Sequence, residues 1–150
     1  MPEFQTKRIV KHSADQMFNL VADIESYPAF VPMCEKLTIR RRSEAEDGTV
    51  TLLADMSIGY KLIRESFTTR VRLDRAARRI LVEYVDGPFS HLENRWLFGD
   101  LEAGGSEVAF FIDYAFKSRT FGMLAGAVFD TVFRRMAQSF ETRADAIYGG

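Results

Sequence analysis

The chain predicts an α+β fold in which a long carboxy-terminal helix and two short helices pack against one face of a seven-stranded antiparallel sheet. Two observations lead to this prediction. Apolar residues recur with a period near 3.6 from Arg119 to Tyr148, as in one long amphipathic helix. Strand-like segments precede it across short turns, and short connections join antiparallel neighbours. The candidate strands span residues 4–10, 36–43, 49–57, 62–73, 79–85, 91–101 and 107–117.

The long helix carries a broad apolar stripe, with polar residues from Asp130 to Asp145 on the opposite side. At about 1.5 Å per residue the helix is roughly 40 Å long, so a sheet that receives it must curl around it. An incomplete fit leaves a cavity between sheet and helix, lined by Phe, Met and Val, which suits a greasy molecule. The stripe consists of Phe121, Leu124, Ala125, Val128, Phe129, Val132, Phe133, Met136, Ala137, Phe140, Ala144 and Ile147.

The segment after the first strand predicts a short helix followed by a turn. Ser13 and Gln16 have the spacing of a capping box, which starts the helix. Tyr27-Pro28 is expected to end it, because the residue before a proline avoids the α conformation. The apolar run 29–33 then predicts one helical turn or a loop. The buried face of the helix is expected to contain Met17, Phe18, Leu20, Val21 and Ile24.

The middle of the chain alternates between apolar and polar residues, as in strands with one buried face. Ile63, Phe67 and Val71 alternate with charged or hydroxyl residues, and residues 108–116 repeat the pattern. Turns are predicted at 46–48, 58–60, 74–77, 86–88 and 103–105. The pattern places helices against the apolar face of the sheet.

Composition narrows the class of protein. A chain of 150 residues is expected to form one domain, residues 1–150, with a substantial core. The net charge of −1 gives no general attraction to nucleic acid, so we expect no specific DNA binding. The single cysteine, Cys34, excludes an intrachain disulfide and fits a reducing compartment. With no signal-peptide pattern and no long apolar run, we expect a cytoplasmic protein whose membrane contact is peripheral.

Chemistry-bearing residues are few. His12 precedes a helix and His91 opens a strand, and neither belongs to a recognisable motif. Cys34 is expected to be a small buried residue and not a nucleophile. No Cys/His spacing typical of a metal site is present. We therefore expect no catalytic residue, no metal and no catalytic cofactor.

Two local motifs resemble those of a known family. The run Asp23–Cys34, which includes Tyr27-Pro28-Ala29-Phe30-Val31-Pro32-Met33, and the Gly87-Pro88-Phe89 turn followed by Leu92 and Trp96 resemble the coenzyme Q-binding family of the START (Bet v 1-like, polyketide cyclase/dehydrase) superfamily. Bacterial members of that family are also described as ribosome association toxins. The resemblance covers essentially the whole chain. One departure is Met33, where members often have Trp; Met keeps the position apolar but removes an aromatic wall and an indole N–H.

The resemblance implies a helix-grip fold with a hydrophobic tunnel that binds ubiquinone, or a similar polyprenyl quinone, in support of respiration. Tyr60 and Tyr114, together with Trp96, are candidates for contact with the quinone head group. Transient contact with the inner face of the plasma membrane follows from such a ligand. The expected tunnel residues are Phe30, Val31, Pro32, Met33, Phe67, Leu92, Trp96, Phe110, Ile112, Leu124, Val128, Phe129 and Val132.

Two further functions are alternatives to lipid binding. The family also implies attachment to the large ribosomal subunit, which blocks subunit joining. A basic patch of Arg8, Lys11 and Arg40–Arg42 is a candidate surface for it, although a solvated sheet face is the simpler interpretation. A polyketide cyclase or aromatase-like enzyme is the third possibility, because related folds include such cyclases.

Two short features have a structural and a functional interpretation. The apolar loop Phe30–Met33 is interpreted as a lid at the tunnel mouth where lipid enters, the alternative being a loop tucked on the core. Gly122 and Gly126 lie four residues apart in the long helix, where each costs about 1 kcal/mol relative to Ala. Close packing against the loop after the first strand is favoured over a hinge at the tunnel end.

Overall fold

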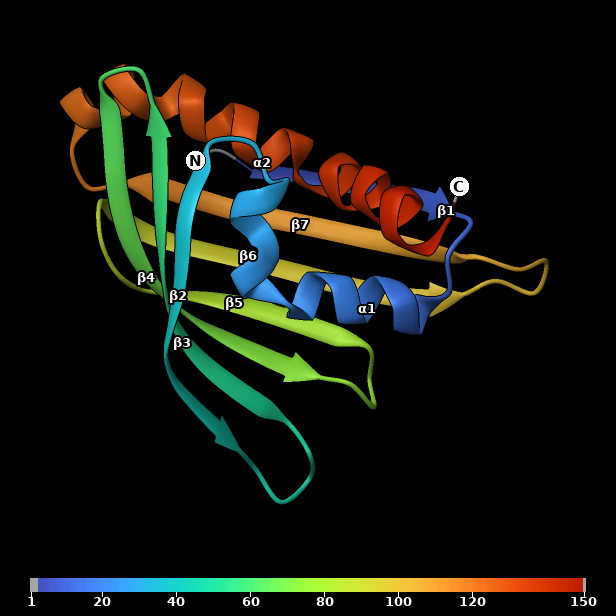
Figure 1. Ribbon diagram of the computed structural model, residues 1–150. Helices are drawn as coiled ribbons and strands as arrows, with labels where there is room; N and C mark the ends of the chain where they lie inside the picture. Colours follow the sequence, from blue (N-terminus) through green and yellow to red (C-terminus); the bar gives the residue numbers. More distant parts are fainter. Residues whose placement is uncertain (1–2, 150) are drawn as a thin grey trace.

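A seven-stranded antiparallel sheet curves around a long helix, as the sequence predicts (Figure 1). The structure is a computed structural model that describes residues 3–149. The strand order is β1-β7-β6-β5-β4-β3-β2, so β1 and β2 form the two edges. The elements are β1 (Glu3–Val10), α1 (Ala14–Ala22), the 3₁₀ helix η1 (Ile24–Ala29), β2 (Cys34–Glu44), β3 (Val50–Tyr60), β4 (Ile63–Asp74), β5 (Arg79–Asp86), β6 (Phe89–Asp100), β7 (Ser106–Phe116) and α2 (Arg119–Tyr148).

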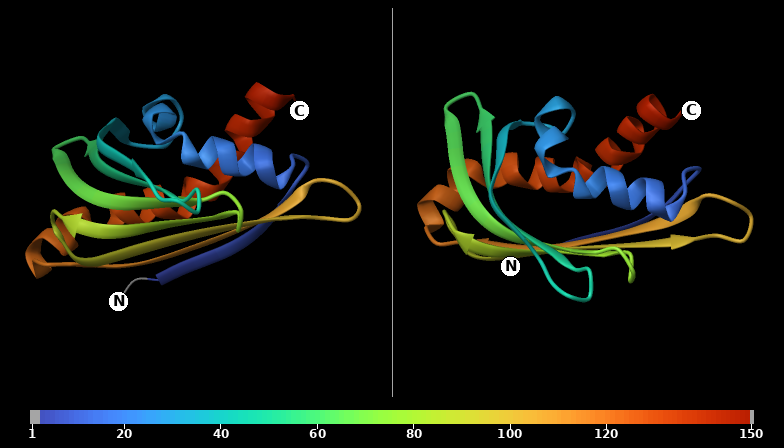
Figure 2. Two further views of the ribbon diagram at one scale, coloured as in Figure 1. Left: turned by 90° about the horizontal axis from the view of Figure 1, so that it is seen from below. Right: turned by 60° about the horizontal axis from the view of Figure 1, so that its bottom comes forward.

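All three helices lie on the concave side of the sheet (Figure 2). The period-2 alternation is confirmed, because every second residue of β7 is buried from Ser106 to Tyr114. In the register of β6 and β7, Trp96 lies opposite Phe110 and Asn94 opposite Ile112. The concave face of the sheet is therefore apolar and faces α2, and the core lies between them. No helix within residues 3–149 is long and apolar enough to cross a membrane.

The turn between β3 and β4 lies later than predicted. The sequence pattern placed it at 58–60, but β3 continues to Tyr60 and the turn consists of Lys61 and Leu62. Gly59 stays in the strand and donates its backbone N–H to the Met33 carbonyl at 2.9 Å. A Cβ at Gly59 would lie 2.2 Å from atoms of the Arg64 and Glu35 side chains, so this glycine makes room for their ion pair.

The capping box at the start of α1 is confirmed. Ser13 Oγ accepts from the Gln16 N–H at 3.1 Å, and Gln16 Oε1 accepts from the Ser13 N–H at 3.0 Å. The predicted end at Tyr27-Pro28 is wrong, because α1 ends at Ala22 and a separate helix, η1, contains Pro28. A proline that far inside an α-helix would clash with the carbonyl four residues earlier, and the break at Asp23 avoids this.

The apolar stripe of α2 is buried through most of its length. Ala125, Phe129, Val132, Phe133, Met136, Ala137, Phe140 and Ala144 are buried. The two ends of the stripe are not, because Leu124 is 68% exposed and Ile147 is 47% exposed. The curved sheet contacts only one side of the first turns, and Leu124 points away from that side.

Polar contacts fasten the carboxy-terminal half of α2. Arg8 Nε donates to Glu141 Oε1 at 2.8 Å, and His12 Nε2 lies 2.7 Å from Asp145 Oδ1. The Tyr148 hydroxyl donates to the Gln16 carbonyl at 3.2 Å. We call these three contacts the polar clasp. They connect the last turns of α2 to β1 and α1, so this half of the helix has a fixed position.

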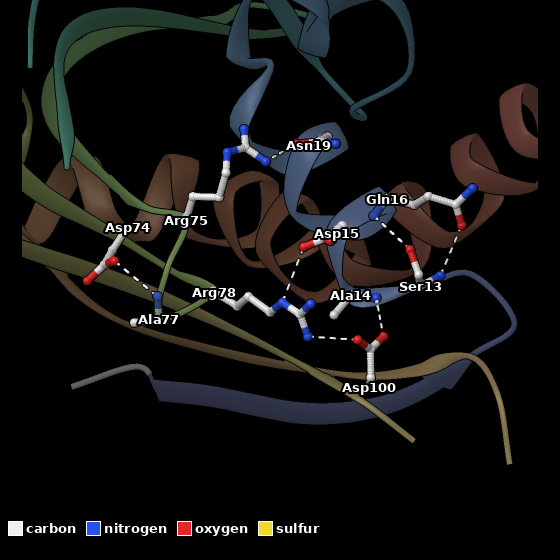
Figure 3. Close-up of polar contacts among 10 residues, drawn as sticks. All are labelled: Ser13, Ala14, Asp15, Gln16, Asn19, Asp74, Arg75, Ala77, Arg78 and Asp100. Atoms are coloured by element: carbon white, nitrogen blue, oxygen red, sulfur yellow. Dashed lines mark hydrogen bonds and ion pairs between the residues drawn. The ribbon is translucent and has the colours of Figure 1, made fainter. Parts of the chain in front are cut away.

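A cluster of charged residues positions the start of α1 over the sheet (Figure 3). Asp100, at the end of β6, accepts from the Ala14 backbone N–H at 2.9 Å and from Arg78 at 2.7 Å. Arg78 also lies 3.2 Å from Asp15 in the first turn of α1. These hydrogen bonds, from the Ala14 N–H first and Arg78 second, lower the pKa of the Asp100 carboxyl. The charged form of Asp100 is thus favoured by folding.

This lowered pKa predicts an acid-dependent effect of Asp100→Asn. A carboxyl whose pKa is lowered by folding stabilises the fold at pH values above its pKa in the unfolded chain, which is about 3.9. That contribution disappears as the pH falls through the pKa of the carboxyl in the folded chain. The variant should therefore unfold at lower denaturant concentration than the parent at neutral pH, with a difference that shrinks below about pH 4. Urea titrations across pH measure this. Glu102→Gln in the exposed 101–105 loop removes the same charge and should show no such effect, and a pH-independent difference for Asp100→Asn would contradict the expectation.

Candidate ligand-binding site

A small cavity lies between the concave face of the sheet, η1 and the middle of α2. Its free volume is about 60 Å³. Six strands of the sheet, β2 to β7, contribute side chains, and η1 and α2 contribute two each. The lining residues are Ile24, Tyr27, Leu37, Ala54, Met56, Phe67, Thr69, Val71, Ile80, Val82, Leu92, Asn94, Trp96, Ile112, Phe133 and Met136. The sequence predicts an apolar space at this interface, and the structure has one there.

Four of the predicted tunnel residues line this cavity: Phe67, Leu92, Trp96 and Ile112. Three others are buried next to it in solid core. Phe110 packs against Trp96 with ring centroids 4.8 Å apart, and Phe129 and Val132 are fully buried under the sheet. Val128 is half-buried and does not line the cavity. Leu124 was predicted to face the tunnel and instead faces solvent.

The predicted lid, Phe30–Met33, is packed on the core. Val31 is 3% exposed, and its N–H donates to the Tyr27 carbonyl at 2.8 Å. The Phe30 ring contacts the Phe140 ring of α2 with centroids 5.0 Å apart, and Pro32 is half-buried beside it. Met33 has a positive φ of 63°. None of the four residues lines the cavity, so the interpretation of an exposed apolar lid is wrong: the hydrogen bonds to Tyr27 fold the loop inward.

The predicted head-group residues do not converge on the cavity. Tyr60 is 40% exposed at the end of β3. Tyr114 is buried against Phe133, with ring centroids 4.8 Å apart, and burial raises the pKa of its hydroxyl to about 12. Trp96 lines the cavity, but its indole N–H donates to Asn94 Oδ1 at 2.9 Å. Of these three side chains only Trp96 reaches the space, and its donor is already in use.

Two polar residues that the sequence analysis missed face the cavity instead. Asn94 is 6% exposed and donates one amide hydrogen to the Phe111 carbonyl at 2.9 Å. Thr69, on β4, is equally buried and lines the same cavity. Both occupy inward positions of strands whose other inward residues are apolar. A polar residue at such a position is the sequence feature from which these two residues could have been predicted.

A cluster of phenylalanine rings fills the space between the cavity and the start of α2. We call it the aromatic cluster, and it consists of Phe67, Phe89, Phe116, Phe121 and Phe129. Phe129 lies at its centre and contacts all of the other four rings. Phe67 belongs both to the aromatic cluster and to the lining of the cavity, so the two are in contact.

Comparison with known proteins places this arrangement in a family. A family model described as polyketide cyclase/dehydrase and lipid transport matches residues 10–141. The chain belongs to this family. The resemblance seen in Asp23–Cys34 and Gly87–Phe89 is thereby confirmed.

Relatives in the family carry two kinds of name. The ribosome association toxin RatA of Escherichia coli K12 is 35% identical over 148 residues, which span 99% of this chain and 90% of the toxin. Coenzyme Q-binding protein COQ10 homolog B of Xenopus laevis is 27% identical over 151 residues, or 98% of this chain and 59% of that protein.

Solved structures confirm the helix-grip, or START/Bet v 1-like, fold. The solution structure of the 18 kDa protein CC1736 from Caulobacter crescentus aligns over 100% of both chains with a TM-score of 0.79 and 32% identity. The Zhui aromatase/cyclase aligns over 96% of this chain and 93% of its own with a TM-score of 0.76, and at 18% identity it shows the fold alone.

The catalytic inventory in this family member is small. Burial raises the pKa of the Cys34 thiol to about 11, which disfavours the reactive thiolate. His12 is buried against Asp145 in the polar clasp. His91 lies 3.3 Å from Asp113 on the convex face of the sheet, away from the cavity. Within residues 3–149, no three His, Cys, Asp or Glu side chains lie close enough together to hold a metal ion.

The predicted basic residues do not form one patch. Arg8 and Lys11 adjoin α2, where they contact Glu141 and Asp145. Arg40 lies on β2, at the opposite edge of the sheet, and its Nε is 2.5 Å from Asp55. The simpler interpretation of residues 40–42 as a solvated strand face agrees with this pairing.

Gly122 and Gly126 both pass close to Phe116. A Cβ at Gly122 would lie 3.1 Å from the Phe116 ring, whereas one at Gly126 would lie 3.9 Å away. Close packing is therefore the role of Gly122, but its partner is the end of β7 and not the loop after β1. Gly126 has room for a methyl group.

This difference predicts opposite outcomes for two alanine variants. Gly126→Ala should stabilise the fold by about 0.5–1 kcal/mol, because Ala loses less backbone entropy in a helix and meets only ordinary contacts. Gly122→Ala should give no gain or a loss, because the Phe116 ring has to shift. Urea denaturation of both variants measures the free energies of unfolding, and equal gains would show that Gly122 is not crowded.

Proposed function

We propose that this chain acts as one lipid-binding domain, residues 1–150, that holds ubiquinone or a related polyprenyl lipid between the sheet and α2. It supports delivery or use of that lipid in respiration. The observation that carries the proposal is the mostly apolar cavity with two inward polar residues, Asn94 and Thr69. The name of the coenzyme Q-binding relative supports the choice of ligand.

The walls of the cavity have to separate to admit such a ligand. Its free volume is about 60 Å³, whereas ligand pockets usually measure about 300 Å³ or more. The carboxy-terminal half of α2 is held by the polar clasp, and its first half by rings of the aromatic cluster. We infer that the first half of α2 is the part that moves, because the polar clasp connects the other half to β1 and α1.

Desolvation supplies the driving force. Apolar surface that leaves water contributes about 25 cal/mol per Å², less the cost of immobilising a flexible tail. The second amide hydrogen of Asn94 and the hydroxyl of Thr69 are donors for the quinone carbonyls. Because such donors fix orientation more than affinity, the isoprenoid tail contributes most of the binding energy.

Mass spectrometry of lipid that co-purifies with the protein tests this proposal directly. A polyprenyl quinone is the expected species. Thr69→Val removes one donor with little change of shape, so it should weaken quinone binding in detergent, whereas Thr51→Val on the convex face should not. A purified protein that carries no lipid and takes up no quinone from detergent would overturn the proposal.

A second candidate function is binding to the large ribosomal subunit. The name of a relative at 35% identity, a ribosome association toxin, supports attachment to ribosomes. One observation favours it: a groove of about 570 Å³ on the convex face of the sheet, with Lys7, Arg79 and Arg95 along it. The Arg95 guanidinium lies 4.1 Å from the centre of the Phe111 ring. Co-sedimentation with large subunits, steeply weakened by salt, would support it. Loss of that binding in Lys7→Glu/Arg79→Glu would assign it to the groove.

The site of action follows from either candidate. We place the protein in the cytoplasm, with transient visits to the inner face of the plasma membrane when lipid is exchanged. Turnover of a polyketide would instead support a cyclase-like enzyme, for which the cavity offers no paired acid and base.

A further inference from the structure

Large apolar side chains are exposed together at one end of the molecule. Leu62, at the tip of the β3–β4 hairpin, is 98% exposed, and Tyr60 beside it is 40% exposed. Met123 and Leu124, in the first turns of α2, are 80% and 68% exposed. The hairpin and the start of α2 lie at the same end of the fold in every view (Figures 1 and 2). We call these four residues the apolar tip.

Folding gives no reason for these residue types. The turn between β3 and β4 contains Lys61 with a positive φ of 53° followed by Leu62, at positions where polar residues and glycine are usual. In α2 the inward side is occupied by Ala125 and Phe129, so Met123 and Leu124 face outward. Both segments thus project apolar side chains into solvent.

Three cations flank the apolar tip, and Glu35, which reaches Gly59 of the hairpin, is paired with Arg64. Lys61 belongs to the hairpin turn, and Lys117 and Arg119 precede Met123. Residues 56–64 and 114–129 contain no Asp or Glu. Among residues 3–149 none of these three cations forms a salt bridge. An anionic partner would complement them.

We propose that the apolar tip docks on the surface of an anionic lipid bilayer. Four apolar side chains on two projecting segments, flanked by unpaired cations, fit a deformable apolar layer beneath negatively charged head groups. The docked end is also the end that contains the aromatic cluster. This inference rests on the proposed function in one respect: it makes the region between the hairpin and the start of α2 the path by which a lipid would reach the cavity.

Co-sedimentation with vesicles tests the docking without any quinone. The probe is vesicles of phosphatidylcholine mixed equally with phosphatidylglycerol, compared with vesicles of phosphatidylcholine alone. The parent should bind the anionic vesicles more tightly. Leu62→Ser/Leu124→Ser should lower the partition coefficient by about tenfold or more, since two leucines no longer enter the apolar layer. Lys61→Glu/Arg119→Glu should remove the preference for anionic vesicles.

Matched controls use apolar residues exposed elsewhere. Ile9 is 72% exposed and Leu97 is 50% exposed, both on the convex face of the sheet. Ile9→Ser/Leu97→Ser should leave vesicle binding unchanged. A dye attached at Leu62→Cys should show a blue-shifted emission on vesicles, and one at Leu97→Cys should not; the native Cys34 is buried.

Three results would overturn the docking proposal. They are absence of parent binding to anionic vesicles, equal losses in tip and control variants, and a lipid-free dimer that Leu62→Ser/Leu124→Ser converts to monomer. The last would assign the apolar tip to a second copy of the chain. Quinone binding in detergent is independent of docking, so tip variants that still bind quinone there but fail on vesicles support both proposals separately.

Discussion

Phe129→Ala is expected to lower the free energy of unfolding by about 3–5 kcal/mol, the usual cost of emptying a buried phenylalanine site. Phe129 is 0% exposed, and its ring centroid lies 5.3 Å from that of Phe89 and 5.5 Å from that of Phe116. Truncation would leave these rings facing a void, because backbone from both the sheet and α2 holds them apart. Since small domains are stable by only about 5–15 kcal/mol, the loss is a large part of the total.

Phe121→Ala provides the matched comparison. Phe121 is half-buried and contacts the same cluster at its outer side, with a centroid distance of 5.5 Å to Phe116. Water can occupy the space that it leaves, so the loss should be well under half of that for Phe129→Ala. Urea denaturation at constant pH gives both values. Losses of equal size would mean that the aromatic cluster is loosely packed and that the first half of α2 is held by other contacts.

The fold was predictable because its main helix and strands depend on periodicity. The apolar stripe of α2 and the alternation in β4 and β7 each extend over many residues, so single exceptions do not obscure them. Features set by one tertiary contact were not predictable. Gly59 looked like a turn residue, but it stays in β3 because the ion pair of Glu35 and Arg64 occupies the place of its side chain.

The apolar character of the site was predictable from the sequence, but only some of its residues were. Inward strand positions such as Phe67 and Trp96 follow from alternation, and both line the cavity. The same rule places Asn94 on the inward face, although its polar side chain interrupts the apolar pattern. The orientation of Phe30–Met33 could not be predicted, because composition shows that a loop is apolar but does not show which way it folds. The exposure of Leu124 depends on where the sheet stops covering α2, which no local pattern encodes.

Ala54→Leu is expected to weaken quinone binding by at least about tenfold, the effect of filling a ligand site, with a change in stability under about 1 kcal/mol. Ala54 is 2% exposed on the concave face of β3 and lines the cavity. Val128 is no position for such a test, because it is half-buried outside that space. The added leucine carbons enter free volume that already exists, so they need not displace neighbours.

Ala144→Leu is the matched control, because it adds the same atoms at a buried position outside the cavity. Ala144 is 0% exposed in α2 and does not line the cavity, so the same three carbons meet packed atoms. Overpacking there should cost about 1–3 kcal/mol and leave quinone affinity in detergent unchanged. Ala54→Leu should therefore change quinone affinity and not stability, whereas Ala144→Leu should change stability and not quinone affinity. If Ala54→Leu binds quinone like the parent and is equally stable, the ligand does not occupy this cavity, and a site outside the sheet and α2 has to be sought.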